Sequence, residues 1–215
     1  MRDIPMFTTE NGIAGLVLRE IPYRGVAYIT LHNSLQPDKL LQDCVEFCRS
    51  AGAKKLYATG HAYLEKFPLH TEIWKMERSL ADLPETDARL CPVTEREIER
   101  WRSLYNEKMV SVPNSATLTK AESQNHLKQG TCYFVYRDSD LLGLGIAAGE
   151  MVESVIAAKP GAGSDVLLAL CGALQSEHAV LEVASTNQPA VRLYERLGFQ
   201  KTTVLSCWYD VEKQC

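Results

Sequence analysis

The sequence predicts an α/β protein with a mixed sheet, in which a smaller α/β half-domain precedes a larger α/β domain. Segments with the alternation of strands take turns with segments of helical periodicity along the whole chain. A polar, Pro-bearing segment without periodicity, 80–92, interrupts this succession and is interpreted as a linker. The 215 residues, 46% of them hydrophobic, suffice for one large domain or two small ones. We place the two parts at residues 1–86 and 87–215.

In the first part the pattern predicts four strands and one helix. The helix, 37–52, has apolar residues at helical spacing, a Pro at its start and a Gly at its end. The segment 21–25, "IPYRG", has the residues of a turn and joins the first two strands. The strands are expected at 12–20, 25–31, 54–60 and 71–79.

The second part opens with a short strand at 89–93. Two helices are expected next, at 94–111 and 117–130, and Thr94 with Glu97 has the spacing of a capping box for the first. Beyond them, strands and helices alternate as in an α/β sheet. The strands are expected at 131–138, 141–150, 151–158, 179–185 and 201–211, and the helices at 166–177 and 187–197.

The charge of the chain is low and evenly distributed. The formal net charge is −4, with 10 basic and 12 acidic residues up to Asp87 and 13 and 15 beyond it. Neither part has the basic excess that binding to a phosphate backbone requires, so nucleic acid is not expected as a partner.

The cysteines and the N-terminus indicate the compartment. Seven cysteines without a CxxC pair argue against a disulfide framework and against a metal site. Cys44 and Cys48 share a helix face, as a metal or redox pair would, but buried thiols are the favoured interpretation. The N-terminus lacks the apolar run of a signal peptide, and no stretch is long enough to span a bilayer. We expect a cytoplasmic protein without a membrane partner.

The segment 185–199, "STNQPAVRLYERLGF", predicts a short helix that stops at Gly198. Positions seven apart lie on one side of a helix, so Asn187 and Tyr194 are expected to face outward together. Ala190, Leu193 and Leu197 form a second stripe, suited to the core. Two interpretations are open: a capped amphipathic helix, or a helix whose polar face contacts a ligand.

In the segment 155–170, "VIAAKPGAGSDVLLAL", an apolar strand ends in a Gly-containing bend that opens a helix. Gly161 and Gly163 permit backbone conformations that a side chain forbids. Free N–H groups at a helix start suit a pyrophosphate, although such a turn also occurs for structural reasons alone. It is not a P-loop, because the Lys-Ser/Thr after the glycines is missing.

A weak internal repeat links the two parts. Residues 51–67 echo residues 176–199, since each has a strand, a polar bend and a Tyr-bearing helical segment that ends in Phe. The first copy lacks the Asn and the Gly. Duplication with loss of chemistry and coincidence both explain it.

Taken together, the two motifs resemble the GNAT superfamily, the acetyl-coenzyme A-dependent N-acyltransferases. The resemblance covers roughly residues 90–211. One departure is that Ala158 stands where the family's phosphate loop usually has Gln or Arg. The matching residues of the helical motif are Asn187, Ala190, Leu193, Tyr194, Glu195, Leu197, Gly198 and Phe199, and those of the loop are Gly161 and Gly163.

The resemblance also implies roles for individual residues. The strand 151–158 offers backbone groups to the pantetheine amides, residues 159–164 hold the pyrophosphate, and Asn187 binds the pantetheine arm. Tyr194 is the acid for the departing thiolate. Glu153 is the candidate base, with Glu150 as its rival. The implied cofactor-binding set is Val155, Ile156, Ala157, Lys159, Gly161, Ala162, Gly163, Ser164, Asn187, Ala190 and Arg192, with Arg196 and Lys201 as further cations for the phosphates.

The implied function is acetyl transfer from acetyl-coenzyme A to a primary amine by direct attack, without a metal. The acceptor, a small molecule or a peptide amine, is expected between the two helices of 94–130 and the sheet, near 111–119. One coenzyme A is expected per chain, in the second part. A catalytically silent acyl-coenzyme A-binding sensor is the alternative, and a homo-oligomer is compatible with the sequence.

Overall fold

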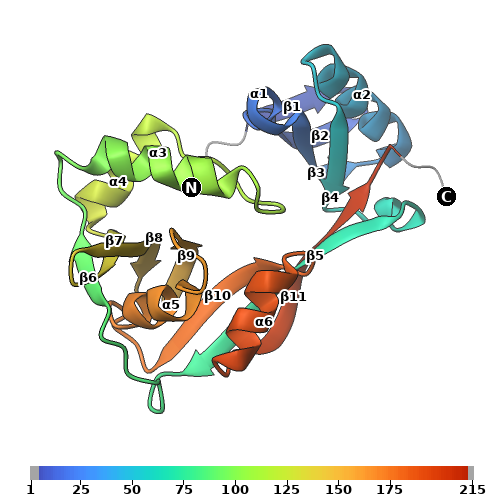
Figure 1. Ribbon diagram of the computed structural model, residues 1–215. Coiled ribbons are helices and arrows are strands. Elements are labelled where there is room, and N and C mark those ends of the chain that lie inside the picture. Colours follow the sequence, from blue (N-terminus) through green and yellow to red (C-terminus); the bar gives the residue numbers. More distant parts are fainter. Residues whose placement is uncertain (1–4, 213–215) are drawn as a thin grey trace. The chain divides into compact units, whose positions relative to one another are not determined.

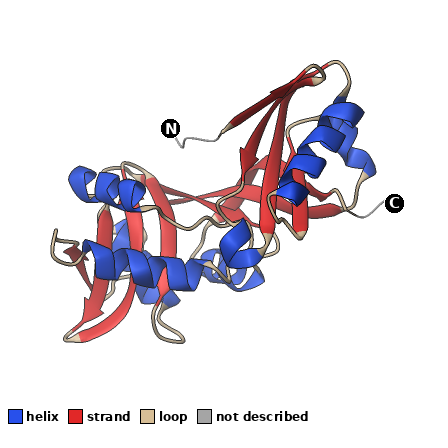
Figure 2. Cartoon of the chain, turned by 90° about the horizontal axis from the view of Figure 1, so that it is seen from above, coloured by secondary structure: helices blue, strands red, loops and turns tan. Residues whose placement is uncertain are grey.

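The computed structural model describes residues 5–212 as a mixed α/β protein (Figures 1 and 2). It divides into two compact units. The first consists of the chain up to Ile73 together with the chain from Val204 onward, and the second is Trp74–Thr203. Within residues 5–212, no helix is both long and apolar enough to cross a membrane.

The unit boundary differs from the expected border between residues 86 and 87. Two long strands, β5 (Leu69–Ser79) and β11 (Gln200–Asp210), each run through both units. They are neighbours: the Asp210 amide donates to the Pro68 carbonyl at 2.9 Å, and the Thr202 hydroxyl donates to the Lys75 carbonyl at 3.4 Å. This pairing assigns the last strand of the chain largely to the first unit, which no local pattern indicates.

In the first unit the strand order is β1-β2-β3-β4-β11-β5. β3 and β4 are parallel and pair continuously from Val26↔Lys55 to Thr30↔Thr59. The helix α2 buries Leu40, Cys44 and Cys48 against the sheet, as its periodicity predicts. The elements are β1 (Met6–Thr9), β2 (Gly12–Val17), α1 (Ile21–Arg24), β3 (Val26–Ser34), α2 (Pro37–Ser50), β4 (Lys55–Thr59) and the 3₁₀ helix η1 (Ala62–Lys66).

Two short elements of the first unit were not expected. β1 is a four-residue edge strand that pairs antiparallel with β2. α1 is one helical turn within the predicted turn 21–25, and Gly25 ends it in the left-handed region with φ 66°. Elements this short leave too few residues for a periodicity to be read.

In the second unit the strand order is β11-β5-β10-β9-β8-β7-β6. One face packs against α5 and α6, and its core includes Val166, Leu170 and Val191. The other face packs against α3 and α4, with Trp101 and Tyr105 in its core. The elements are β6 (Arg89–Pro92), α3 (Ile98–Met109), α4 (Lys120–Gln129), β7 (Cys132–Arg137), β8 (Asp140–Ala148), β9 (Met151–Ala157), α5 (Gly163–Cys171), β10 (His178–Ala184) and α6 (Gln188–Arg196).

Three details of the second unit differ from the sequence-based expectations. Thr94 and Glu97 do bond to each other, but they close a turn before α3 starts; the reciprocal capping box belongs to α4, at Thr119 and Glu122. The helix α5 starts at Gly163 and is shorter than predicted. The expected linker 80–92 is not free, because its apolar side chains pack against the core of this unit.

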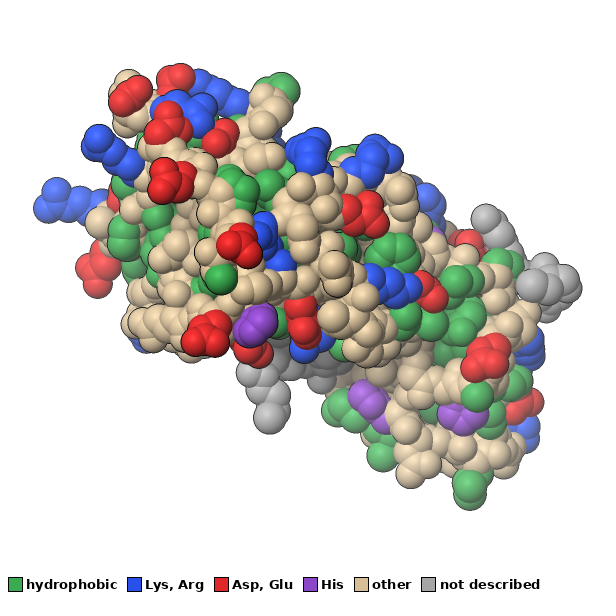
Figure 3. Space-filling model, turned by 90° about the horizontal axis from the view of Figure 1, so that it is seen from below, with side chains coloured by type: hydrophobic (Ala, Val, Ile, Leu, Met, Phe, Trp, Pro, Cys, Tyr) green, Lys and Arg blue, Asp and Glu red, His purple; other side chains and the backbone are tan. Residues whose placement is uncertain are grey.

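The interpretation of Cys44 and Cys48 as buried thiols is confirmed. Both are fully buried, and burial raises the pKa of Cys44 to about 12 and that of Cys48 to about 11. Within residues 5–212, no three His, Cys, Asp or Glu side chains gather as metal ligands would. On the face in Figure 3, acidic and basic side chains are interspersed.

Candidate functional site

The parallel strands β9 and β10 of the second unit part soon after they start. Their pairing consists of Met151↔Val180 and Val152↔Leu181. Beyond these positions the described residues form no further ladder pair between the two strands, although β9 continues to Ala157 and β10 to Ala184. Parallel strands otherwise pair continuously. The edge of β9 that faces β10 is therefore left open to an extended ligand.

A β-bulge lies where the strands part. On its other edge β9 pairs with β8 through Ser154↔Ile146 and Val152↔Ala147, which leaves Glu153 without an opposite residue. Bulges of this kind re-aim side chains and are frequent beside active sites. Glu153, the predicted base, is exposed at this point. Its rival Glu150 lies close enough to Lys75 to contribute to the raised pKa of that lysine; the main cause of the raised pKa is the hydrogen bond that Lys75 donates to the Glu77 carboxylate.

The three residues of β9 that are predicted to line the cofactor differ in the burial of their side chains. Ile156 is buried on the side of α3 and α4, and Val155 packs partly into the core beneath α5. Ala157 is exposed. Because the Ile156 side chain is buried, this residue can contact a ligand only through its backbone. Backbone contact is also the role that the resemblance implies for the strand 151–158.

The Gly-rich bend leads into α5 with its first N–H groups free of helical acceptors. The first helical bond runs from the Val166 amide to the Ala162 carbonyl, at 3.0 Å. Gly161 has φ 83°, which a side chain rarely adopts. A Cβ added at Gly163 would lie 3.0 Å from Leu193 Cδ2, so this glycine lets α6 approach closely. Ala162 is buried at the N-cap.

Charged side chains around this bend are unevenly distributed. Arg196 of α6 donates to the Ser164 hydroxyl at 3.2 Å, which places a cation beside the start of α5. Lys159 instead pairs with Asp140 at 2.7 Å. Asp165 is held by Arg137 at 3.0 Å.

Two further predicted cations have other surroundings. Arg192 is exposed on α6. The Lys201 ammonium lies 4.0 Å from the centroid of the Trp74 ring. Arg196 is therefore the predicted cation for which the structure shows a contact with the bend.

The helix α6 begins and ends as its sequence predicts. Asn187 is the N-cap, and its side-chain oxygen accepts from the Ala190 amide at 3.4 Å. At the other end Gly198 has φ 82°, its amide donates to the Glu195 carbonyl, and the Phe199 amide donates to the Tyr194 carbonyl. These two bonds form a Schellman motif.

The outward position predicted for Tyr194 was wrong. Val191 and Tyr194 are the buried residues of α6, while Ala190, Leu193 and Leu197 are partly buried and pack against the same core, as predicted. The Schellman motif explains why Tyr194 is buried. In this motif the residue four positions before the C-terminal glycine commonly packs against the residue that follows the glycine. Here those residues are Tyr194 and Phe199, whose ring centroids lie 6.1 Å apart. The Gly-Phe ending was the sequence signal for an inward Tyr194.

The burial of Tyr194 changes its chemistry. Desolvation raises the pKa of its hydroxyl to about 12. Among the described residues no hydrogen bond is found for this hydroxyl, and it is not one of their fully buried side-chain atoms that lack a partner. Tyr194 is thus a core residue that keeps one free donor.

Sequence reasoning missed Ser154. This residue is 6% exposed, and its Oγ is buried without a hydrogen-bond partner. Such a hydroxyl costs about 1–3 kcal/mol. A Ser between Glu153 and Val155 in a strand gives no sequence signal of this kind, because its burial follows from the pairing with β8.

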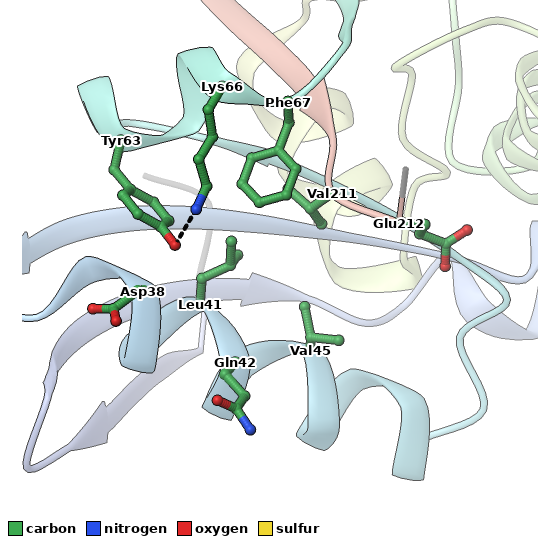
Figure 4. A pocket seen from close by; sticks show the side chains of 9 residues that line it. All are labelled: Asp38, Leu41, Gln42, Val45, Tyr63, Lys66, Phe67, Val211 and Glu212. Atoms are coloured by element: carbon green, nitrogen blue, oxygen red, sulfur yellow. Dashed lines mark hydrogen bonds between the residues drawn. The ribbon is translucent and has the colours of Figure 1, made fainter. Parts of the chain in front are cut away.

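The first unit contains a hollow of about 640 Å³ between α2 and η1 (Figure 4). Its one lysine, Lys66, lies 3.8 Å from the centroid of the Tyr63 ring and donates to the Tyr63 hydroxyl. Asp38 lines the same hollow at the start of α2, and Glu212 pairs with Arg49. This charge distribution does not suit a pyrophosphate.

Comparison with solved structures identifies the fold. The chain is similar to a GCN5-related N-acetyltransferase from Kribbella flavida (14% identity, 97% of this chain and 88% of that one covered, TM-score 0.58). It is also similar to a GCN5-related N-acetyltransferase from Sphaerobacter thermophilus (14% identity, 93% of this chain and 76% of that one covered, TM-score 0.55). A third similar structure is a GNAT-family acetyltransferase from Colwellia psychrerythraea (14% identity, 95% of this chain and 84% of that one covered, TM-score 0.53). No protein-family model matches the sequence, and no curated protein matches it either. The predicted GNAT-like fold is confirmed.

Proposed function

We propose that the chain is an N-acyltransferase that moves an acetyl group from acetyl-coenzyme A to a primary amine by direct attack. The observation that carries the proposal is the parting of β9 and β10 after Val152, in the same unit as the Gly-rich start of α5. An opened parallel pair offers an extended ligand a strand edge, and a helix start offers its anionic end free N–H groups. The GNAT-like fold supports the same interpretation.

The residues present fit coenzyme A on three counts. Backbone groups of 153–157 are available to the pantetheine amides. The N–H groups of Gly163 and Ser164, with the Arg196 guanidinium beside them, suit the pyrophosphate. Asn187 uses its oxygen as the helix cap and retains two N–H donors for the pantetheine arm.

The proposed chemistry needs one proton acceptor and one donor to sulfur. Glu153, exposed at the bulge, takes the proton that the attacking amine loses. Tyr194 acts as a hydrogen-bond donor to the departing sulfur, not as a full acid. Transfer of its proton from a pKa of about 12 to a thiolate of pKa ~8.5 is uphill by about 5 kcal/mol. The released thiolate takes up a solvent proton, which balances the proton that Glu153 passes on to solvent.

A single coenzyme A site per chain, in the second unit, is part of the proposal. In the first unit the parallel strands β3 and β4 stay paired through five successive positions. The helix that follows β3 starts with Pro37 and Asp38, where an anion would be repelled. We therefore interpret the first unit as the one without a cofactor site.

Two measurements test the proposal. Calorimetry with acetyl-coenzyme A should give a stoichiometry near one, and a thiol-release assay with a panel of primary amines should give turnover. Binding without turnover on any amine favours the catalytically silent sensor. Absence of binding removes both functions.

A further inference from the structure

Ser154 carries the buried hydroxyl without a partner described above, and its position in the sheet defines where it points. Ile146 lies directly opposite it on β8 and belongs to the cluster that contains Trp101 of α3. Opposed residues of antiparallel strands share a face. The Ser154 side chain therefore points into the layer between the sheet and α3.

The same residue lies at the opening of the candidate site. It follows the bulged Glu153 directly and comes two positions after Val152, the last residue of β9 that pairs with β10. The bulge also reverses the alternation, so that Val152 faces the α5 side and Ser154 the α3 side. Ser154 is thus at the point where the open strand edge and the α3 layer meet.

Folding alone does not account for a hydroxyl here. The neighbours of Ser154 on this face, Leu144, Ile146 and Ile156, are apolar and buried. Ala would occupy the position without an unpaired polar atom, and it would leave the fold as stable or more stable. Departures from the rules of a packed core are expected at functional sites, where another molecule supplies the missing partner.

We propose that Ser154 Oγ binds the acceptor amine and orients it. The oxygen accepts a hydrogen bond from one N–H of the amine, which directs the nitrogen lone pair at the acyl carbon. This inference rests on the proposed function. In the transfer the C–N bond forms and the C–S bond breaks with its electron pair on sulfur. The amine proton passes to Glu153 and on to solvent, the released thiolate takes up a solvent proton, and Ser154 remains a neutral hydroxyl throughout.

The test compares two serines of the second unit in the full-length protein. Ser154 is buried without a partner, whereas Ser123 of α4 is fully buried and donates to the Lys120 carbonyl at 2.9 Å. The variants are Ser154→Ala, Ser154→Cys and, as the matched control, Ser123→Ala. The probes are acetyl-coenzyme A with n-butylamine, benzylamine, putrescine and a lysine-containing tripeptide.

Ser154→Ala should lower kcat/KM for the accepted amine about 10- to 100-fold, as expected for a lost hydrogen bond to a polar ligand. Its melting temperature should stay unchanged or rise, and its Kd for acetyl-coenzyme A should stay unchanged. Ser154→Cys keeps the size but has a weak acceptor, so it should fall between the wild type and Ser154→Ala. Ser123→Ala should show the opposite pattern, with a lower melting temperature and unchanged kcat/KM.

Two results overturn the inference, and they are distinguishable. Turnover by the wild type with an unchanged kcat/KM in Ser154→Ala removes Ser154 from the acceptor site and leaves the proposed function intact. Binding of acetyl-coenzyme A without turnover on any of the amines removes the proposed function, and the role of Ser154 with it.

Discussion

The two units of this chain contain the same local plan, a parallel strand pair joined by a helix and followed by a short helical segment, but they use it differently. In the first unit β3 and β4 pair from Val26↔Lys55 to Thr30↔Thr59, and the strand pair is closed. In the second unit β9 and β10 pair at two positions and then part. The difference shows that the plan alone does not create a binding site; the site requires the interrupted pairing.

The helical segments after the second strand of each pair show the same contrast. Asn187 caps α6 through its side-chain oxygen, and His61 caps η1 by accepting from the Tyr63 amide at 3.0 Å. Each segment carries a tyrosine. Tyr194 is buried, whereas Tyr63 is partly exposed and its hydroxyl accepts a hydrogen bond from the Lys66 ammonium. Both tyrosines keep their own O–H, so the two segments differ in burial and in the neighbouring cation, not in the donor.

The largest expected effect comes from Glu153, which has no counterpart in the closed strand pair. Glu153→Gln keeps the size of the side chain but removes the proton acceptor, and it should lower kcat about 10²- to 10⁴-fold. Acetyl-coenzyme A affinity, measured by calorimetry, should not change. Glu150→Gln is the control three residues upstream and should leave kcat within about twofold. An equal loss in both variants would mean that the bulge does not single out Glu153.

A smaller effect is expected from Tyr194. Tyr194→Phe removes a hydrogen bond to a developing thiolate and should lower kcat about 10- to 150-fold, since hydrogen bonds to charged groups contribute about 1.5–3 kcal/mol. Its stability to urea should remain close to that of the wild type, because Phe packs equally well against Phe199.

Tyr63→Phe is the matched change in the first unit. It breaks the bond to Lys66 and should leave turnover unchanged. Wild-type turnover in Tyr194→Phe would show that its hydroxyl has no part in the reaction.

The first turns of α5 and α2 can be compared by exchanging the residues at their second positions. Ser164 is the second residue of α5, and Asp38 is the second residue of α2. Ser164→Asp should weaken coenzyme A binding about tenfold or more, because it places an anion at the proposed pyrophosphate site. An acid in the first turn favours the helix, so the melting temperature should not fall.

Asp38→Ser is the reciprocal variant. It should bind coenzyme A with the affinity of the wild type and with a stoichiometry of one. A stoichiometry of two in either protein would contradict the assignment of the site to the second unit alone.

The smallest differences are expected for the buried thiols, which both units contain. Burial raises the pKa of Cys44 to about 12 and those of Cys48, Cys132 and Cys171 to about 11. At pH 8 these four should resist iodoacetamide in the native protein, as read by mass spectrometry, while the less buried Cys91 and Cys207 react.

These thiols also predict a pH dependence of stability. Because the folded pKa values lie above those of the unfolded chain, the unfolded state releases these protons first as the pH rises. The free energy of unfolding should therefore fall above about pH 8.5, by roughly 2 kcal/mol per thiol at pH 10. A flat urea-denaturation profile between pH 8 and 10 would contradict this.

Local sequence determined the elements around the candidate site. Asn187 and Gly198 define both ends of α6, because a cap and a left-handed glycine act within a few residues. Gly161 and Gly163 likewise predict the bend before α5. The inward position of Tyr194 was also present in the sequence, since Gly198 followed by Phe199 specifies the contact.

Tertiary structure alone decided what makes these elements a site. The position of β5 between β10 and β11 depends on pairing such as that of Thr202 with Lys75, which are 127 residues apart. The pairing of the strands determines where β9 parts from β10 and where the bulge at Glu153 lies. The bulge in turn directs Ser154 to the α3 side, where its hydroxyl has no partner. Periodicity reports which face of a strand is apolar, but it holds no information about which strand lies beside it or where their pairing ends.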